Sequence, residues 1–241
     1  MSTYQDVFKR YEKKYLLDQT QYRRLSQLLQ PRMGRDRFSE STISNIYYDT
    51  PDFRLIRASL AKPAYKEKLR LRTYRTPHDD TEAFVEIKKK FAGVVYKRRV
   101  GMRYDDALDY LGGASAPEDT QILREIDWFR QFYGDLQPAM CIYYDRLALF
   151  ERENPALRIT FDAGIRWRRE TLDLAAGTWG DALLAPEQCL MEVKIPGATP
   201  LWLARALSGI GIFPVSFSKY GAAYSQLLQG RPAAERSVFC A

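Results

Sequence analysis

The chain of 241 residues contains few histidines and cysteines, on which many catalytic triads, zinc sites and disulfide frameworks depend. It contains one histidine, His78, and three cysteines, Cys141, Cys189 and Cys240. A single histidine in a loop argues against Ser-His-Asp and Cys-His catalysis. An odd number of cysteines without metal-binding spacing argues against a disulfide framework and a zinc site. We expect Cys141 and Cys189 to be core residues of strands.

Membrane and targeting segments are also missing. No run approaches the roughly 18 apolar residues of a membrane helix, and the first ten residues lack the apolar centre of a secretory signal. We therefore expect a cytoplasmic protein with no transmembrane segment, for which a membrane-protein partner remains open. Because no Pro/Gly/Ser-rich linker interrupts the chain, we expect one domain over residues 1–230 and a flexible tail over residues 231–241.

The chain has an excess of positive charge, with a net charge of +7. This charge suits an anionic ligand without identifying it. Strand side chains alternate between faces, so basic residues at every second position share one face, with Leu69 and Leu71 on the other. This pattern runs for about 20 Å through Lys66, Lys68, Arg70 and Arg72. An anion lying among these cations would relieve their mutual repulsion.

The pattern Glu-x-Lys occurs three times, at 12–14, 86–88 and 192–194, whereas the composition alone predicts about 0.6 copies. Each copy lies in strand-like sequence, so its Glu and Lys share a face. Carboxylates bind a hard metal ion and ammonium groups bind phosphate oxygens, as a metal–polyphosphate site requires. Solvated salt bridges on an exposed sheet face are the simpler alternative.

The periodicity predicts about eight strands and five or six helices. The strands are expected at 8–17, 41–48, 65–74, 83–91, 94–103, 139–150, 157–168 and 189–195. The helices are expected at 18–29, 52–57, 105–111, 118–133, 201–210 and 220–228. Because hairpins link most of the strands, we expect an α+β fold with an antiparallel sheet and helices outside it. If the sheet closes into a barrel, its polar faces could line a cavity.

Further strands also combine an apolar face with a charged one. Positions that share the charged face are Lys97 with Arg99, Tyr144 with Arg146, and Arg158 with Thr160 and Asp162, whereas Arg98 takes the opposite face. Exposure of these faces to solvent is one explanation. The interior of a tunnel explains better why the charged face is rich in cations on five or six strands.

Nucleic-acid binding is an alternative explanation of the basic charge. Tyrosines and phenylalanines are interleaved with Arg and Lys, as at Tyr47 and Tyr48, and could stack on bases. Such aromatic residues are more often part of a strand core. The chain also has no Walker motif, no G-x-G-x-x-G and no kinase loop. We therefore expect no nucleic-acid partner.

Six motifs, in this order, resemble the VTC domain, the polyphosphate polymerase domain of the vacuolar transporter chaperone complex. They are Tyr-Glu-Lys-Lys-Tyr (11–15), Ile-Tyr-Tyr-Asp-Thr-Pro-Asp-Phe (46–53), Tyr-Lys-Glu-Lys-Leu-Arg-Leu-Arg (65–72), Val-Glu-Ile-Lys (85–88), Tyr-Tyr-Asp-Arg (143–146) and Met-Glu-Val-Lys (191–194). That domain is a triphosphate tunnel metalloenzyme, related to the CYTH phosphatases and cyclases. The resemblance implies an eight-stranded antiparallel β-barrel that uses Mn²⁺ or Mg²⁺. It would transfer the γ-phosphoryl group of ATP to inorganic polyphosphate.

The resemblance also implies roles for individual residues. The catalytic positions that grip phosphates would be Lys14, Arg70, Arg72, Lys88, Arg146 and Arg158. Further phosphate-binding residues would be Lys97, Tyr144, Ser218 and Lys219, and the charge pattern adds Lys66, Lys68, Arg99 and Lys194. The metal ligand would be Glu192, with Glu86 and Glu12 as helpers. The chain departs from the family at Ser216, where one of two paired lysines is missing.

Two other functions fit the same fold. One is a tunnel hydrolase of tripolyphosphate or a nucleoside triphosphate, and the other is a non-catalytic polyphosphate-binding module. Hydrolases of this superfamily tend to carry Glu-x-Glu-x-Lys on the first strand, where this chain has Arg10-x-Glu12-x-Lys14. Fewer carboxylates and more cations favour holding a long anion over activating water, so polymerase is the preferred interpretation.

Overall fold

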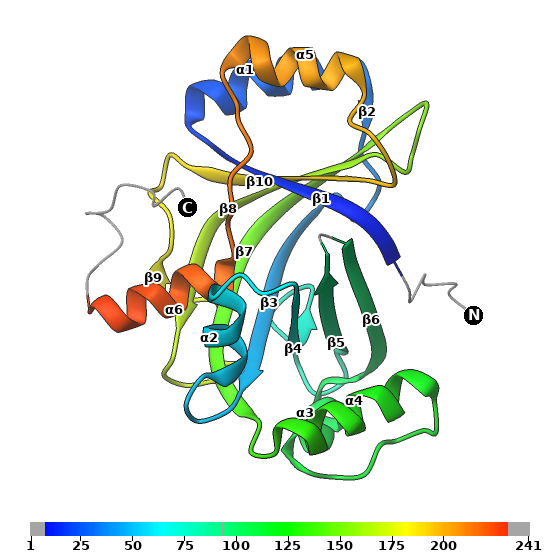
Figure 1. Ribbon diagram of the computed structural model, residues 1–241, viewed down its shortest axis with the longest axis vertical. Coiled ribbons are helices and arrows are strands. Elements are labelled where there is room, and N and C mark those ends of the chain that lie inside the picture. The colour runs from blue at the N-terminus through cyan, green and yellow to red at the C-terminus, as the bar shows by residue number, and fades with distance from the viewer. Residues whose placement is uncertain (1–7, 93, 231–241) are drawn as a thin grey trace. The chain divides into compact units, whose positions relative to one another are not determined.

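This computed structural model describes residues 8–92 and 94–230, with side chains from residue 11 onward. The described residues form ten strands and six helices. The strands are β1 (Phe8–Leu17), β2 (Met33–Gly34), β3 (Glu40–Asp49), β4 (Tyr65–Thr73), β5 (Glu82–Phe91), β6 (Val94–Arg103), β7 (Gln137–Glu151), β8 (Arg158–Arg168), β9 (Asp181–Ala182) and β10 (Cys189–Ile195). The helices are α1 (Gln19–Leu29), α2 (Arg54–Leu60), α3 (Tyr104–Gly112), α4 (Gln121–Tyr133), α5 (Leu201–Ile210) and α6 (Lys219–Gln229), labelled in Figure 1.

The strands form an antiparallel sheet accompanied by helices, which confirms the predicted α+β class. The described sheet has ten strands rather than eight. The two additional strands, β2 and β9, have two residues each and are too short to show a period in the sequence. The prediction of an eight-stranded barrel is therefore not confirmed.

The chain divides into two compact units. Within the described residues, the first consists of 8–9, Ile43–Tyr143 and Trp167–Gly180, and the second of Arg10–Thr42, Tyr144–Arg166 and 181–230. One domain over residues 1–230 remains a prediction. The tail expected at residues 231–241, with Cys240, lies outside the described residues.

In the first unit, β3, β4, β5 and β6 lie side by side in chain order, as Figure 1 shows. One face of these strands is apolar, with Leu69 and Leu71 of β4 and Val85 and Ile87 of β5 all buried. These residues share a hydrophobic core with buried residues of α3 and α4. The prediction that Leu69 and Leu71 face a core is confirmed.

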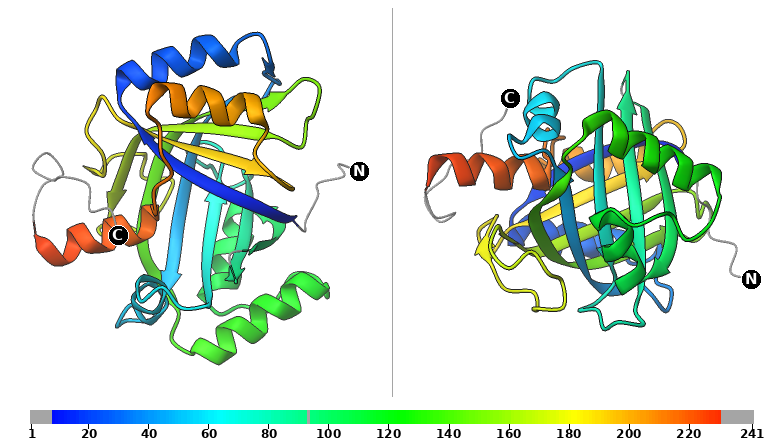
Figure 2. Two further views of the ribbon diagram at one scale, coloured as in Figure 1. Left: turned by 45° about the horizontal axis from the view of Figure 1, so that its top comes forward. Right: turned by 90° about the horizontal axis from the view of Figure 1, so that it is seen from below.

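Helix α4 contributes an apolar stripe to this core, in which Leu123, Ile126 and Phe129 are buried. The helix begins at Gln121, three residues later than predicted, because Thr120 is its N-cap. The Thr120 side chain accepts a hydrogen bond from the backbone N–H of Leu123, which satisfies one of the free donors of the first turn. Figure 2 shows α3 and α4 packed beside β5 and β6.

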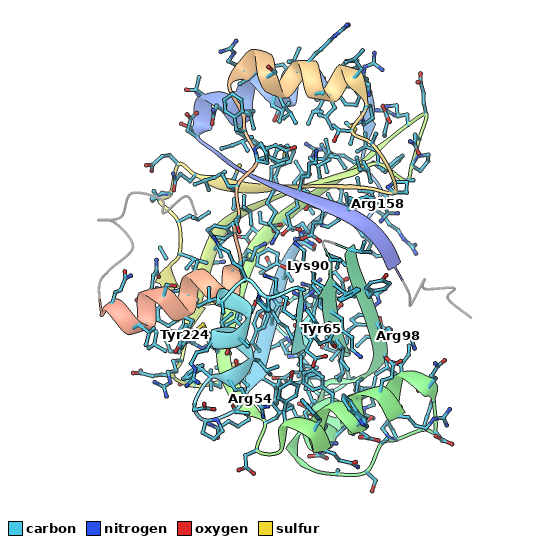
Figure 3. All side chains as sticks on the ribbon, viewed as in Figure 1. Arg54, Tyr65, Lys90, Arg98, Arg158 and Tyr224 are labelled. Carbon is cyan, nitrogen blue, oxygen red and sulfur yellow. The ribbon has the colours of Figure 1, made fainter. Side chains whose placement is uncertain are left out.

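Arg98 shows how the charges of β6 divide between the two faces. Its Nη1 lies 2.9 Å from Oε1 of Glu125 on α4, on the side of the apolar core (Figure 3). Its neighbours Lys97 and Arg99 pair in register with Lys88 and Glu86 of β5 on the other face. The predicted division is confirmed.

Buried Asp49, at the end of β3, holds the first turn of α2. The Oδ1 atom of buried Asp49 accepts a hydrogen bond of 2.8 Å from the N–H of Leu55, and Oδ2 accepts one of 3.0 Å from Ile56. These bonds satisfy donors in the first turn of α2 that have no partner within the helix. The helix begins at Arg54 rather than at residue 52 as predicted.

In the second unit, β10 lies between β1 and β8. The apolar face of these three strands includes the buried residues Tyr15, Met191 and Ile159. Helices α1 and α5, which lie side by side in Figure 2, contribute Leu25 and Leu203 to the same core. The remaining face of each strand is polar, as the alternation predicts.

Helix α1 begins where the sequence places its cap. The Asp18 side chain accepts a hydrogen bond from the N–H of Gln21, and the Gln21 side chain accepts one from the N–H of Asp18. This reciprocal pair is a capping box, which fixes the end of β1 relative to the helix. The helix predicted over 18–29 therefore begins one residue later, at Gln19.

Cys141 and Cys189 are free and buried, as predicted from their positions in strands. The buried environment raises the pKa of both thiols, to about 12 for Cys189. A thiol with a raised pKa is a poor nucleophile at neutral pH. Of the six described helices, none combines the length and the apolar character that crossing a membrane requires.

Candidate functional site

Cations line the face of β4, β5 and β6 that lies opposite the apolar core. The register arranges this face in four rows, two of which place like charges directly across from one another. The rows are Arg72 and Phe84; Arg70, Glu86 and Arg99; Lys68, Lys88 and Lys97; and Lys66 and Lys90. We call these eight cations and Glu86 the basic face. Because like charges directly opposite one another destabilise a sheet, this arrangement needs a physical reason.

Glu86 is the anionic centre of this face. Its Oε2 atom lies 2.6 Å from Nη2 of Arg70 and 3.8 Å from Nε of Arg72, and its Oε1 atom lies 2.5 Å from Nζ of Lys97. The Glu86 side chain is fully buried, whereas those of Arg70 and Lys97 are 13% and 20% exposed. We call these four residues the Glu86 cluster.

Strand β3 orients the two arginines of the cluster. Nη1 of Arg70 donates a 3.1 Å hydrogen bond to the hydroxyl of Tyr47, and Nε of Arg72 donates one of 3.0 Å to Oδ1 of Asn45. The amide of Asn45 in turn donates to the carbonyl of Ile142 on β7. These bonds fix the planes of both guanidinium groups, which is what bidentate binding of a phosphate requires.

Burial and the neighbouring charges have opposing effects on the pKa values of Glu86 and Lys97. Burial raises the pKa of Glu86, but Arg70, Arg72 and Lys97 together outweigh burial and hold this pKa well below its usual range. Burial lowers the pKa of Lys97 to about 7, with the attraction of Glu86 only partly offsetting burial and the repulsion of the two arginines. Lys97 can therefore gain or lose its proton near neutral pH.

A second carboxylate surrounded by cations lies in the second unit. Glu192 of β10 pairs in register with Lys14 of β1 and Thr160 of β8. One of its oxygens lies 2.8 Å from Nζ of Lys194, and the other lies 3.3 Å from Nζ of Lys219 and 3.6 Å from Nζ of Lys14. Lys14 also lies 3.6 Å from Glu12.

Asp162 is a second buried carboxylate beside Glu192. Arg146 binds it with two parallel hydrogen bonds, of 2.6 Å from Nε and 2.8 Å from Nη2. Nζ of Lys219 lies 2.5 Å from Oδ2 of Asp162 and 4.4 Å from the ring centroid of Tyr144. We call this set the Glu192 cluster; its members are Glu12, Lys14, Arg146, Asp162, Glu192, Lys194 and Lys219.

The cations of this cluster keep both buried carboxylates ionised. Burial raises the pKa of Glu192, but Lys194, Lys219, Lys14 and Arg146 hold it well below its usual range. Burial acts in the same way on Asp162, whose pKa is lowered by Arg146 and Lys219. For Lys219, burial is outweighed by the attraction of Asp162 and Glu192, so its pKa is raised.

The family model for the VTC domain matches residues 9–228, almost the whole chain. The chain belongs to the VTC domain family. The resemblance drawn from the six sequence motifs is therefore confirmed. Among curated protein sequences, none matches the chain significantly.

Solved structures show the fold that this VTC domain shares. A provisionally assigned adenylate cyclase of Bacillus halodurans is 15% identical, with a TM-score of 0.57 over 89% of this chain and 96% of that one. An adenylyl cyclase-like protein of Hippeastrum, described as having a dominant triphosphatase activity, is 16% identical, with a TM-score of 0.52 over 92% of this chain and 96% of that one. These similarities place the VTC domain in the fold of the triphosphate tunnel proteins.

The structure brings most of the proposed site residues of this VTC domain into the two clusters or the basic face. Arg70, Arg72, Lys97 and Glu86 form the first cluster. Lys66, Lys68, Lys88 and Arg99 belong to the surrounding basic face, and Lys14, Arg146, Lys194, Lys219, Glu12 and Glu192 form the second cluster, with Tyr144 against it. Their roles in binding phosphate or metal stay predictions.

Arg158 and Ser218 stand apart from these contacts. Arg158 lies in register with Lys194 at the start of β8, where it is exposed (Figure 3). The Ser218 hydroxyl caps α6 by accepting a hydrogen bond from the N–H of Gly221. This cap gives Ser218 a structural role in addition to the phosphate contact that the family resemblance implies.

Sequence analysis did not assign a site role to three residues that lie in the clusters or are hydrogen-bonded to them. The alternation along β8 places Asp162 on the same face as Arg158 and Thr160. Its two cationic partners, Arg146 of β7 and Lys219 of α6, come from other elements. Tyr47 and Asn45 are also visible only through the pairing of β3 with β4. Pairing between strands, unlike alternation within one, cannot be read from a single segment.

Triphosphate tunnel enzymes generally use divalent metal ions, and carboxylate oxygens are the ligands that Mg²⁺ and Mn²⁺ prefer. Glu192 fits such an ion by donor type, and its side chain is 8% exposed, with Lys194 and Lys219 at 2.8 and 3.3 Å from its two oxygens. Glu86 fits less well, since Arg70 and Lys97 hold its two oxygens at 2.6 and 2.5 Å in a fully buried position. Within the described residues, no three His, Cys, Asp or Glu side chains are grouped as a metal site.

An open pocket of about 640 Å³ in the second unit is a different feature. Of the site residues, its lining includes only Arg146. The other charged residues that line it are Glu40, Asp145 and Glu187, so its charge is opposite to that of a phosphate site. This pocket does not suit an anionic ligand.

Proposed function

We propose that this VTC domain is a metal-dependent polyphosphate polymerase, which transfers the γ-phosphoryl group of ATP to a growing inorganic polyphosphate chain. The observation that carries the proposal is the basic face, on which eight cations surround a single carboxylate. Like charges in register are costly unless an anion neutralises them. A polyphosphate chain carries negative charge along its whole length and would neutralise several rows at once.

Phosphoryl transfer suits such a surface because the reaction asks mainly for positioning and for stabilisation of charge. Arg70 and Arg72, held in fixed planes by Tyr47 and Asn45, would each bind two phosphate oxygens. Lys97 would add a third cation to the same group of oxygens. The carboxylate of Glu86, which lies close to all three cations, would stay in place and balance their charge.

The Glu192 cluster would supply the remaining contacts to the substrate. Lys14, Lys194 and Arg146 all carry donors within 4 Å of Glu192, and their side chains are 15% to 20% exposed. They would turn from the carboxylate to phosphate oxygens when substrate binds.

A divalent ion, Mn²⁺ or Mg²⁺, would neutralise charge between phosphate groups when bound. Glu192 would hold it, with Glu12 as an additional carboxylate, since both lie 3.6 Å from Nζ of Lys14. Asp162 is less suited because Arg146 and Lys219 occupy both of its oxygens.

A second candidate is a triphosphatase, in which water rather than polyphosphate accepts the phosphoryl group. The observation in its favour is the similarity in fold to the Hippeastrum protein, for which a dominant triphosphatase activity is described. Two further cationic rows, Lys68 with Lys88 and Lys97 and Lys66 with Lys90, favour the polymerase, because a triphosphate alone does not need them.

The two candidates are separated by their products. Purified protein would be incubated with ATP and Mn²⁺, or with Mg²⁺, and analysed on a polyphosphate gel together with assays for ADP and free phosphate. Long chains and ADP with little free phosphate are expected for the polymerase. Free phosphate without chains would establish a triphosphatase, and neither product would favour a binding module.

The variant R70Q should abolish whichever product forms, and R98Q is its matched control. Arg70 and Arg98 are both strand arginines, but Arg98 pairs with Glu125 on the opposite face. Equal losses in the two variants would mean that the basic face has no special role. Loss in R70Q alone supports a reaction on the basic face.

A further inference from the structure

Helices α1 and α5 lie side by side in the second unit (Figure 2) and run in opposite directions. At the start of α1, the side chain of Gln21 donates a 3.3 Å hydrogen bond to the carbonyl of Gly211, just after the end of α5. At the other end, Cζ of Arg32, shortly after α1, lies 5.0 Å from the ring centroid of Trp202 at the start of α5. The buried leucines of both helices face the core of the unit, so the opposite sides of both helices are exposed.

These two helices carry basic residues and no acidic ones. Helices of 11 and 10 residues would contain about 2.6 Asp and Glu at the average composition of the chain. Arg23 and Arg24 of α1 and Arg205 of α5 are exposed, and within the described residues none of the three side chains makes an ion pair or a hydrogen bond. Arg35 of the same unit, in contrast, lies 2.9 Å from Glu40. The charge of the three helix arginines is therefore available to an external anion.

Two exposed leucines accompany these cations. Leu28 of α1 is 49% exposed and Leu201 of α5 is 63% exposed. Leu28 follows Arg24 by four residues, so these two side chains share one stripe of the helix. The opposite directions of the helices place both leucines toward the end where Arg32 lies over Trp202. We call the exposed residues Arg23, Arg24, Leu28, Arg32, Leu201 and Arg205 the α1–α5 face.

The chemistry of the α1–α5 face distinguishes between classes of anionic partner. The side chains of Arg23, Arg24 and Arg205 are not fixed by hydrogen bonds, whereas Arg70 and Arg72 are held by Tyr47 and Asn45. Mobile cations suit an array of headgroups better than one ligand of fixed geometry. Stacking on nucleic-acid bases needs exposed aromatic side chains, which this face does not contain. Aliphatic side chains beside arginines are typical of surfaces that lie in the interface of a membrane.

We propose that the α1–α5 face binds the surface of an anionic lipid bilayer. Its four arginines would lie at the level of the headgroup phosphates, and its two leucines would enter the layer between the headgroups and the acyl chains. Such binding combines electrostatic attraction, which salt screens, with burial of apolar surface. It uses no residue of the basic face or of the Glu192 cluster and does not depend on the proposed polymerase activity.

Sedimentation of the full chain with vesicles tests this proposal. Vesicles of phosphatidylcholine alone are compared with vesicles of phosphatidylcholine and phosphatidylglycerol in equal parts, at low and at high salt. We expect the wild type to bind the anionic vesicles at low salt and to stay in solution with the neutral ones. R24Q/R205Q should weaken binding to anionic vesicles by at least about tenfold, because one arginine near such a surface contributes roughly fivefold.

The control for charge is R103Q/R124Q. Both arginines belong to the first unit, where Arg103 pairs with Asp80 and Arg124 pairs with Asp119. This variant loses the same net charge as R24Q/R205Q but leaves the α1–α5 face intact. Its binding to anionic vesicles should change by less than about twofold.

The leucines separate a lipid surface from a soluble polyanion. L28Q/L201Q keeps every charge of the α1–α5 face and removes its two aliphatic side chains. It should weaken binding to anionic vesicles by at least about threefold, because less apolar surface is buried. Binding of polyglutamate, measured by fluorescence anisotropy of a labelled chain, should not change in this variant.

No binding of the wild type to anionic vesicles at low salt, or equal binding to neutral ones, would overturn the proposal. Equal losses in R24Q/R205Q and R103Q/R124Q, or no loss in R24Q/R205Q, would overturn it as well, because the position of the arginines would then not matter. Binding of polyglutamate that requires Arg24 and Arg205, without vesicle binding, would assign the face to an acidic protein instead. Thermal unfolding of each variant would verify that folding is intact.

Discussion

The ammonium group of Lys219 lies 2.5 Å from Oδ2 of Asp162 and 3.3 Å from Oε1 of Glu192, so a single cation links two buried carboxylates. The Lys219 side chain is only 7% exposed. A lysine in this position neutralises protein charges before any ligand arrives. Sequence resemblance assigned Lys219 to phosphate, and the structure adds this second role.

The first prediction concerns that link. K219M and D162N should each destabilise the protein, by about 2 kcal/mol, because each removes a hydrogen-bond partner from a buried charge, while Arg146 still binds Asp162 and Glu192 still faces Lys219. The double variant should be destabilised by less than the sum of the two, with a coupling of at least about 1 kcal/mol. Urea unfolding of the four proteins measures this coupling, and additive effects would show that Lys219 and Asp162 do not stabilise one another.

The second prediction concerns stability in acid. The pKa of Glu86 is well below its ordinary value of 4.5, so the unfolded chain binds a proton more readily than the folded one. The stability that this carboxylate supplies is complete above about pH 4.5 and is lost as the pH falls toward the folded pKa. Glu192 acts in the same direction. We expect E86Q to be less stable at neutral pH and to lose stability less steeply on acidification.

Chemical unfolding between pH 3 and pH 7 checks this expectation, with E82Q as the control on the same strand, where Glu82 is exposed. E86Q should also gain more thermal stability from tripolyphosphate than the wild type does, since Arg70, Arg72 and Lys97 lose their internal anion. Parallel pH profiles for E86Q and the wild type would contradict the assigned charge of Glu86.

The third prediction concerns Lys97, whose pKa is lowered to about 7. Below this pH the ammonium is charged and available to an anion, and above it the neutral amine binds anions weakly. Binding of tripolyphosphate in EDTA at pH 8 should therefore be accompanied by uptake of a proton by Lys97. Calorimetry in buffers of different ionisation enthalpy measures this uptake. In K97R the guanidinium stays charged, so the uptake assigned to Lys97 should disappear, and an unchanged proton count would refute the assignment.

The fourth prediction separates chemistry from binding at Glu192. E192Q should lower turnover with Mn²⁺ by at least about 100-fold, because the proposed metal ligand is lost. Its tripolyphosphate affinity in EDTA should fall by no more than a few fold, since Lys14, Lys194 and Arg146 remain. E187Q changes an exposed carboxylate of the same unit and serves as the control. Equal loss of turnover and of metal-free binding would assign Glu192 a purely structural role.

Much of the basic face could be predicted from alternation alone. One face of β4 carries Lys66, Lys68, Arg70 and Arg72, and the other carries Leu69 and Leu71. This division, and the separation of Arg98 from Lys97 on β6, follow from a period of two within one strand. The capping box at Asp18, at the start of α1, depends on equally local residues. Such features depend on residues a few positions apart, and the sequence displays them directly.

Features that depend on distant pairing could not be predicted in this way. Asp162 becomes a site residue only because Arg146 and Lys219, from β7 and α6, converge on it. The strands β2 and β9 exist only through backbone pairing with longer strands. Arg158, in contrast, had the expected alternation, yet the structure leaves it exposed at a strand end. Register and burial are properties of the assembled sheet, not of one segment.

The strict alternation of β4, β5 and β6 has a consequence for the divergence of this family. Inserting or deleting one residue within β5 would turn Lys88 and Lys90 toward the side of α3 and α4 and Val85 and Ile87 toward the basic face. Both the core and the basic face would be disrupted in one step. Lengths of these strands can therefore change only by residues in pairs or at the turns, which makes the hairpin tips the places where related chains are free to differ.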